Sequence, residues 1–457
     1  MAWQIKKLFL KILPILFLIL IPAFFGLSTN VKKNEAEYDI NYASLYEEVN
    51  FLDKLDKYKT LDENKVVILK YKEDKQTNNY WSDNVKVISH ISPKTIVEIK
   101  EFSTSQEWFD ALDSIDTKIT KFVLHLYNDV PFLDNVSWEG NIHNRFLDYL
   151  FYVKGLINIF NVDVNSKEKW STNNIVLVGT YGSFKNNKFL PGQTQNLYKT
   201  NLSQNQNSII KPNIYIPKIS FKKEGKIQSS YDSKLSASIF AALASKLNML
   251  LETKQNYIMK NLKVLNAIYA SAKQFEKRNI SFSGFDTQLG LGKFNFSGAW
   301  QILSKDENNP EVIFNKEEKA FIYEFELDKN EQLQVSALFP KIDFYIDPDP
   351  RYFNLWKYLA IPFKIQLNAL VSLFSGTNIE EQIFKDIFVR NEAFNIYLEK
   401  FIGEWERVAF SNSKKSNIEK IIYKSDIKTK YRIVIEPEEL IYTIESSYFN
   451  LAILKNN

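Results

Sequence analysis

A stretch of small residues near the middle of the chain constrains its fold most. The segment from Gln228 to Ala244 reads QSSYDSKLSASIFAALA, in which serine and alanine alternate with large apolar residues. Small side chains let a helix approach its neighbours closely, as the dense packing of protein interiors requires. We therefore predict a helix that is buried in the core. Its small positions are Ser236, Ala237, Ala241, Ala242 and Ala244.

Strand and helix patterns alternate upstream of this segment. Helical patterns cover Ser105–Ile115 and Arg145–Lys154, whereas Val85–Ile91 fits either a strand or a short helix. Strands separated by helices predict a mostly parallel sheet with helices on both faces. The apolar runs typical of buried strands are Val66–Leu69, Thr95–Phe102, Lys121–Asn128, Gly155–Val162 and Asn174–Tyr181.

Three segments, taken in order, carry a resemblance to a known family. KPNIYIP at Lys211–Pro217 precedes the small-residue segment, and GFDTQLGLGKFNFSGAWQIL at Gly284–Leu303 follows it. This order resembles the C-terminal half of the subtilisin-like serine peptidases, the subtilases. With the upstream strands, the resemblance covers residues 63–305 and implies a subtilisin-like α/β core. It also identifies Gly290-Leu291-Gly292 as the family's closing turn and not as a dinucleotide-binding motif.

The resemblance implies where a catalytic triad would stand, and the residues present do not suit it. The family's aspartate falls near Lys70, its histidine near Trp81, and its serine near Lys234. Lysine cannot accept the imidazole N–H, and an ammonium group repels the imidazolium that forms during catalysis. We therefore expect a degenerate member of the family, without catalytic residues.

Residues next to these three positions leave open the alternative that the chain is an active peptidase with an unorthodox site. A small shift in alignment would offer Ser233 or Ser236 as the nucleophile, and Asp83 as a base in an unusual setting. Asn161 lies close to the position of the family's oxyanion-hole asparagine, but the accompanying glycine is missing and turn chemistry explains Asn161 better. Leu126-Tyr127-Asn128 replaces a glycine-bearing strand, and its bulky side chains would obstruct a substrate backbone.

Composition limits the other kinds of binding and catalysis that the chain could support. The chain has 457 residues, no cysteine and three histidines, and its net charge of +4 is too weak to indicate nucleic-acid binding. The histidines do not have metal-ligand spacing, so we expect no metal and no cofactor. His125 alternates with apolar residues, which predicts a core histidine. His143 precedes a helix, which predicts a solvated or capping residue, and His90 comes too late for the family's histidine motif.

The pattern changes after Leu303 to the alternation of apolar and polar residues that is typical of antiparallel strands. We predict a β-sandwich domain over 306–457, with a helical insertion near 352–405. The order of these segments resembles the sandwich that often follows a subtilase domain. The candidate strands are Glu318–Leu327, Leu333–Pro340, Ile418–Ser425, Lys430–Pro437 and Tyr448–Leu454. We interpret one cluster of glutamates as surface charge, namely Glu436, Glu438 and Glu439.

The N-terminus has the pattern of an exported protein. Three lysines precede an apolar run from Ile12 to Leu27. Residues 1–29 therefore fit either a cleaved signal peptide or a membrane anchor, and residues 30–62 fit a linker. Positive charge before the apolar run favours an extracellular location for the rest of the chain. We expect the protein at the cell membrane on its outer side, or secreted if the segment is cleaved.

These patterns together predict an exported, surface-located, subtilase-like protein that is catalytically inactive. Its expected role is that of a scaffold or binding subunit, with a protein partner such as an active homologous peptidase. Two alternatives remain: an active subtilisin-like serine endopeptidase with an unorthodox site, and a surface adhesin. Labelling by a serine-reactive probe separates the enzyme from the others, and co-purification from detergent separates a complex subunit from a free adhesin.

Protease shaving of intact cells tests the predicted topology. Added protease should degrade the bulk of the protein, because the basic N-terminal end favours export of the residues downstream of the apolar run. A cytoplasmic protein monitored in the same sample is the control and should stay intact. Full protection of the bulk of the chain would contradict an extracellular location.

Overall fold

The computed structural model describes eighteen stretches of the chain, and they fall into two compact units. The smaller unit comprises residues 1–41 and 220–229, and the larger one residues 42–219 and 230–457. In the smaller unit, β1 (Asp39–Ile40) pairs antiparallel with β8 (Ile219–Lys223), which neighbours β9 (Lys226–Ser230). The described stretches are 39–52, 64–72, 78–127, 130–133, 142–152, 154–161, 174–181, 213–223, 226–230, 233–251, 260–275, 290–315, 318–339, 342–345, 388–390, 393–412, 417–439 and 446–456.

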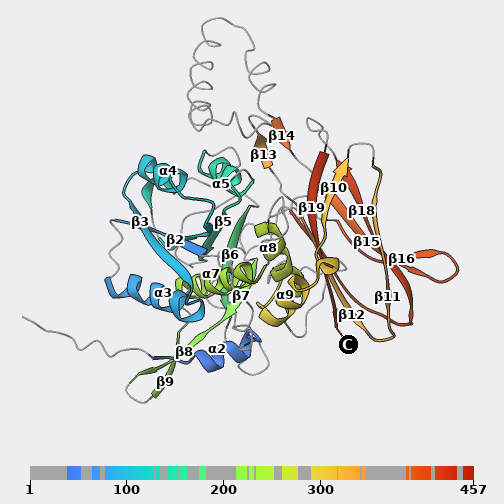
Figure 1. Ribbon diagram of the computed structural model, residues 1–457, viewed down its shortest axis with the longest axis horizontal. Helices are drawn as coiled ribbons and strands as arrows, with labels where there is room; N and C mark the ends of the chain where they lie inside the picture. The colour runs from blue at the N-terminus through green and yellow to red at the C-terminus, as the bar shows by residue number, and fades with distance from the viewer. Residues whose placement is uncertain are drawn as a thin grey trace, which may run out of the picture. The chain divides into compact units, whose positions relative to one another are not determined.

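A six-stranded parallel sheet organises the first part of the larger unit (Figure 1). Its strands have the order β3-β2-β4-β5-β6-β7, and every neighbouring pair is parallel. The inner strands are nearly continuous apolar runs because helices cover both faces, whereas the edge strand β3 is only partly buried. The predicted parallel α/β sheet is therefore confirmed. The bounds are β2 (Asn64–Tyr71), β3 (Thr95–Phe102), β4 (Thr120–His125), β5 (Ile157–Asn161), β6 (Ile175–Tyr181) and β7 (Ile214–Pro217).

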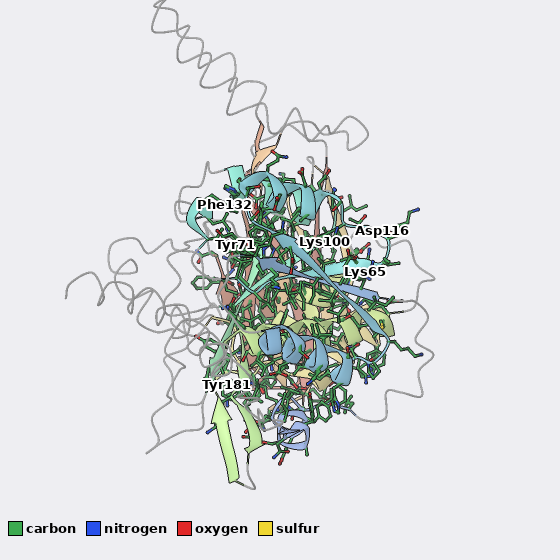
Figure 2. The ribbon with its side chains drawn as sticks, turned by 90° about the vertical axis from the view of Figure 1, so that its left-hand side faces the viewer. Lys65, Tyr71, Lys100, Asp116, Phe132 and Tyr181 are labelled. Atoms are coloured by element: carbon green, nitrogen blue, oxygen red, sulfur yellow. The ribbon has the colours of Figure 1, made fainter. Side chains whose placement is uncertain are left out.

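One face of this sheet carries α4 (Ser105–Asp113) and α5 (Ile142–Tyr152). Their apolar residues join those of the strands in one core, with Trp108 at its centre. Figure 2 shows the two ends of β2, with Lys65 at its start and Tyr71 near the ring of Phe132 at its end. The rings of Tyr71 and Phe132 meet edge to face, with their centroids 6.5 Å apart.

The opposite face carries α3 (Asn78–Ile91) and α7 (Ser233–Leu250). The helix α7 contains the predicted small residues, and all five of them are fully buried. Ser236 near its start bonds to Thr180 on β6, with 2.8 Å between the hydroxyl oxygens. Ser245 near its end accepts a 2.8 Å hydrogen bond from Asn64 at the start of β2. The predicted buried helix is therefore confirmed, and it runs antiparallel to the strands.

The type and the ends of single helices were predicted less well than the sheet. The ambiguous segment Val85–Ile91 forms the second half of α3. The helix α4 starts where it was predicted, and its cap is Thr104, whose side chain accepts from the backbone N–H of Glu107. The helix α2 (Tyr42–Glu48) precedes the sheet. The structure also describes two short 3₁₀ turns, η2 (Pro131–Leu133) and η3 (Asp306–Asn308).

Two antiparallel sheets of four strands form the C-terminal part, which agrees with the predicted β-sandwich (Figure 1). One sheet has the order β10-β19-β12-β17 and the other β11-β18-β15-β16. Alternating apolar residues of both sheets build a single core around Val335, Ile396 and Ile433. The bounds are β10 (Glu311–Asn315), β11 (Phe321–Leu327), β12 (Gln332–Leu338), β15 (Ala393–Phe401), β16 (Trp405–Ser411), β17 (Ile418–Lys424), β18 (Thr429–Glu439) and β19 (Ser446–Asn456).

The predicted helical insertion near 352–405 is wrong in its last part. The strand β15 lies inside that range, and so does β14 (Phe388–Arg390), which pairs with β13 (Ile342–Tyr345). Phe394, Ile396 and Leu398 are buried at every second position, which is the period of a strand and not of a helix. Residues 352–387 lie outside the described part of the chain, as do residues 1–38 with the predicted apolar segment.

Two helices connect the parallel sheet to the sandwich, α8 (Lys260–Ser271) and α9 (Phe296–Leu303). The side-chain N–H₂ of Asn266 in α8 donates to the backbone oxygen of Ser336 at 3.0 Å and to that of Asn450 at 2.8 Å. The ammonium of Lys420 donates to the carbonyl oxygens of Tyr269 and Ala272, at 2.8 and 3.2 Å. Complete burial lowers the pKa of Lys420 to about 7.

Positive backbone angles support the interpretation of the Gly290–Gly292 segment as a closing turn. The φ angle is 57° at Gly290 and 114° at Gly292, a range that glycine adopts without strain. A Cβ atom at Gly292 would stand 2.4 Å from the backbone oxygen of Lys273. Within the described residues, no helix has the length and apolar character needed to cross a membrane.

Overpacking of α7 tests how closely the small-residue helix is packed. Ala241→Leu should destabilise the protein by about 1–3 kcal/mol, because the added methyl groups have no space in a filled core. The measurement is the midpoint of urea unfolding. Ser89→Leu, at an exposed position of α3, is the control and should leave the midpoint nearly unchanged. Equal midpoints for both variants would contradict close packing around Ala241, which is fully buried.

Candidate functional site

The three positions that the sequence singled out lie at one end of the α3–α7 layer. Lys70 is the last but one residue of β2, so it lies at the carboxyl edge of the parallel sheet. Asn64 and Lys70 are six residues apart on the same strand and therefore share a face. Because Asn64 bonds to Ser245 in α7, this face is the one that α3 and α7 cover.

Both helices of this layer begin at the same edge. The hydroxyl of Ser238, in the second turn of α7, donates to Asn84 Oδ1 at the middle of α3 at 2.7 Å. Near their ends, Thr95 bonds to Ser92, which directly follows α3, at 2.8 Å and to Ser245 at 2.9 Å. Thr95 is the first residue of β3, which is at the amino edge. The first turns of α3 and α7 therefore lie towards the carboxyl edge, where ligands of parallel sheets bind.

Trp81 lies in the first turn of α3, and Lys234 is the second residue of α7. The structure thus brings both of them towards the end of the sheet that holds Lys70. Lys70 forms an ion pair with Glu101 on β3, with 2.8 Å between its ammonium nitrogen and the carboxylate oxygen. Lys234 is buried. The side chain of Trp81 lies outside the described residues.

Neither lysine is the residue type that the resemblance implies at its position. A triad aspartate accepts the imidazole N–H, and a lysine ammonium has no acceptor. The N-terminal end of a helix carries a partial positive charge, which favours anions and disfavours an ammonium such as that of Lys234. The helix ends at this edge therefore suit negative charge.

The alternative nucleophiles are placed differently. Ser236 is fully buried, and its hydroxyl is bonded to Thr180 on β6. A substrate therefore has no access to its oxygen in this structure. Ser233 is the first residue of α7, but its side chain lies outside the described part. Asp83 approaches Lys86 one turn further along α3, at 3.8 Å, and both side chains are largely exposed.

His125 is a core histidine, as the sequence predicted. Its ring stacks on Phe160 with 4.0 Å between centroids. Its Nδ1 lies 2.8 Å from the hydroxyl of Tyr127, and its Nε2 lies 3.0 Å from Asn158 Oδ1, which fits a neutral ring protonated at Nε2. Burial lowers the pKa of His125 to about 3, against the opposing effect of the hydrogen bond to Asn158.

His143 is buried, so the solvated position that the sequence offered as one alternative is wrong. It is the second residue of α5, and its ring stacks on that of Phe109 with 5.1 Å between centroids. Burial lowers its pKa to about 4. Its Nε2 lies 3.0 Å from the hydroxyl of Ser105, the first residue of α4. Sequence reasoning missed this pair because the two residues are 38 positions apart and neither belongs to a motif.

The end of β4 is filled where a substrate strand would lie. Leu126 and Tyr127 are buried, and the hydroxyl of Tyr127 accepts a 3.0 Å hydrogen bond from the indole N–H of Trp108. Asn161 is the last residue of β5 and stands at the same carboxyl edge, so its role as an oxyanion donor stays a prediction. His90 is exposed and stacks on Tyr42 with 3.6 Å between centroids.

Within the described stretches, no three histidines, cysteines or carboxylates come together in a way that would hold a metal ion. Glu436 is a partly buried residue of β18, and the two other glutamates of the predicted surface cluster have no described side-chain environment.

Comparison with known proteins adds distant structural matches. The prenylagaramide maturation protease PagA is 14% identical, with 55% of this chain and 98% of that chain covered, at a TM-score of 0.36. A lanthipeptide protease is 11% identical, with 57% and 94% covered, at 0.37. The pre-peptidase C-terminal domain of a collagenase from Bacillus anthracis is 7% identical, with 32% and 86% covered, at 0.17.

No family model matches the sequence. No curated protein matches it either. Identities and TM-scores this low carry neither the activity nor the partners of the matched proteins over to this chain. The fold therefore rests on the strand order, the helix directions and the two C-terminal sheets described above.

The two buried histidines should make the fold sensitive to acid. Both have a folded-state pKa below the usual value of about 6.5, so the unfolded chain binds more protons as the pH falls below that value. The free energy of unfolding should therefore decrease from about pH 6.5 towards pH 4. Urea unfolding at several pH values measures the effect.

Single substitutions separate the histidines from the carboxylates that titrate in the same range. His143→Gln keeps a side-chain amide near Ser105 and should make the loss of stability below pH 6.5 less steep. His90→Gln, at an exposed position, should leave the slope unchanged. Identical slopes for the wild type and His143→Gln would contradict the buried neutral state of His143.

Proposed function

We propose that this chain is a subtilisin-like protein without peptidase chemistry and that it serves as a scaffold or binding subunit at the cell surface. The observation that carries the proposal is the composition of the carboxyl edge. Lys70 is ion-paired and Lys234 is buried, and these are the positions at which the resemblance implies an aspartate and a nucleophilic serine. Members of a triad act as a unit, so the loss of one removes most of the rate.

Burial of Ser236 supports the same proposal. A nucleophile must reach within about 3–3.5 Å of the carbonyl carbon that it attacks. The oxygen of Ser236 lies between α7 and β6, where it is bonded to Thr180, and the residue has no exposed surface. A peptide bond reaches it only if α7 leaves the sheet, which would open the core of the domain.

The Ser105–His143 pair favours a second candidate, a serine hydrolase with an unorthodox site. The 3.0 Å separation is that of a nucleophile and its general base. A base with a pKa of about 4 is weak at neutral pH, because general-base catalysis is best when the pKa lies near the working pH. We therefore place this candidate second and use the same experiment to distinguish the two.

A fluorophosphonate probe decides between the proposals. The purified full-length protein should show no labelling above that of a heat-denatured sample, because an unactivated serine does not react. An active subtilisin is the positive control. Stoichiometric labelling would overturn the non-catalytic proposal. Ser105→Ala, Ser233→Ala and Ser236→Ala would then identify the reactive oxygen, and labelling lost only in Ser105→Ala would establish the second candidate.

The proposed role as a subunit requires a protein partner. A partner such as an active homologous peptidase would complete a complex whose other component supplies the chemistry. Cross-linking on intact cells, followed by purification from detergent, should recover such a peptidase in constant ratio to this chain. Recovery of the chain alone, together with binding to host protein, would favour the surface adhesin instead.

A further inference from the structure

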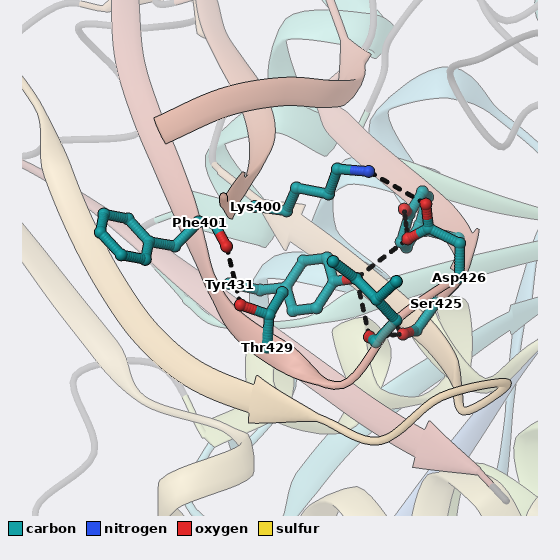
Figure 3. A network of polar contacts seen from close by, with 8 residues as sticks. Lys400, Phe401, Ser425, Asp426, Thr429 and Tyr431 are labelled. Atoms are coloured by element: carbon teal, nitrogen blue, oxygen red, sulfur yellow. Dashed lines mark hydrogen bonds and ion pairs between the residues drawn. The ribbon is translucent and has the colours of Figure 1, made fainter. Parts of the chain in front are cut away.

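Three turns meet at one end of the β-sandwich. The β15–β16 turn begins at Phe401, whose carbonyl oxygen accepts a 2.7 Å hydrogen bond from the hydroxyl of Thr429 (Figure 3). The β17–β18 turn comprises residues 425–428, between Lys424 and Thr429. The β11–β12 turn is joined to it by paired backbone bonds between Ser425 and residues 330 and 331, each 2.9 Å long.

Large apolar side chains project from two of these turns. Ile402 is 53% exposed, Phe401 is 40% exposed and Ile427 is 38% exposed. We call these three residues the apolar tip. Trp405 is partly buried, and its ring meets that of Phe401 edge to face with 5.3 Å between centroids. Exposed isoleucine and phenylalanine next to a partly buried tryptophan form a pattern that suits a lipid–water interface.

A polar network holds the tip in place. Asp426 forms an ion pair with Lys400 at 3.0 Å (Figure 3). The hydroxyl of Tyr423 donates to the other carboxylate oxygen at 3.3 Å. The hydroxyl of Ser425 donates to the carbonyl oxygen of Ile427 at 2.6 Å. The apolar side chains are therefore presented by a fixed backbone, and their exposure is not the result of a loose loop.

Charges around the tip are mixed, and the acidic ones nearest the β17–β18 turn are paired. Asp328 pairs with Lys428 at 2.8 Å, and Asp426 pairs with Lys400. The carboxylates nearest the β17–β18 turn are therefore paired, and exposed lysines lie around the apolar tip. On the β16 side, Glu404 and Glu406 are also exposed. The exposed lysines of these turns and the adjoining strands are Lys329, Lys424, Lys428 and Lys430.

We propose that the apolar tip inserts into the interfacial region of a lipid bilayer. A protein partner is less suitable, because a specific interface needs about 800 Å² on each side and three side chains on convex turns do not provide it. A fluid lipid surface surrounds a convex tip and needs no complementary pocket. This inference is independent of the proposed non-catalytic role, and it adds a second lipid contact to the predicted N-terminal segment.

The absence of cysteine from the chain makes the test direct. Ile402→Cys is labelled with an environment-sensitive NBD dye in the full-length protein, which is reconstituted with vesicles of phosphatidylcholine or of phosphatidylcholine with phosphatidylserine. The matched control is Ile313→Cys on β10, because that isoleucine is also 53% exposed. NBD emission at position 402 should shift to the blue and be quenched by doxyl-labelled lipid, whereas emission at position 313 should do neither.

A second pair of variants keeps the test decisive. Ile427→Cys should report the same shift, and adding Ile402→Asp to it should abolish that shift because a carboxylate resists burial in lipid. Circular dichroism checks that each variant is folded. No shift at 402, or equal shifts at 402 and 313, would overturn the proposal. If the shift grows with protein concentration in the absence of vesicles, the apolar tip binds a second copy of the chain, and the lipid proposal is wrong.

Discussion

The close packing of α7 against the parallel sheet is the constraint on which the rest of the larger unit depends. The helix packs across the sheet, and its five predicted small residues are fully buried. Its serines make polar contacts within this core, with Thr180 near one edge and with Asn64 and Thr95 near the other. These bonds fix how far the helix can slide, because a buried hydroxyl without its partner is costly.

This arrangement holds the fold together through residues whose structural role does not depend on catalysis. Serine at position 236 is as useful to packing as to chemistry, because its small side chain fits below β6 and its hydroxyl satisfies Thr180. At the carboxyl edge, the ion pair of Lys70 with Glu101 ties β2 to β3. The residues that stand at the expected triad positions therefore contribute to the structure in ways that a peptidase site does not require.

Sequence patterns predicted the elements whose signals are local and strong. The parallel strands are continuous apolar runs, and α7 has an unusual content of small residues, so both were found. The segment at Ala393–Phe401 was misassigned because Phe394, Ile396 and Leu398 come after a long apolar stretch in which the period of two is hard to see. The strand gains its stability from pairing with β18, which is more than thirty residues away.

The burial of the histidines could be predicted only where the neighbouring residues indicate it. His125 sits within an apolar strand, so its burial was evident from its neighbours. The burial of His143 depends on Phe109 and on Ser105, which belong to another helix, and no pattern around position 143 indicates them. Contacts between distant segments are set by the tertiary structure, so the Ser105–His143 pair could be found only from coordinates.

The bonds between α8 and the sandwich bear on the order in which the chain folds. The carbonyl groups at the end of α8 accept from Lys420, which lies 151 residues after Tyr269. The side-chain N–H₂ of Asn266 donates to Asn450, 184 residues further on. During synthesis, which proceeds from the N-terminus, α8 emerges long before these partners exist. Until the last strand of the sandwich is made, the nascent protein carries a helix with polar groups that only later segments can satisfy. A chaperone would bind the nascent chain most usefully in this interval.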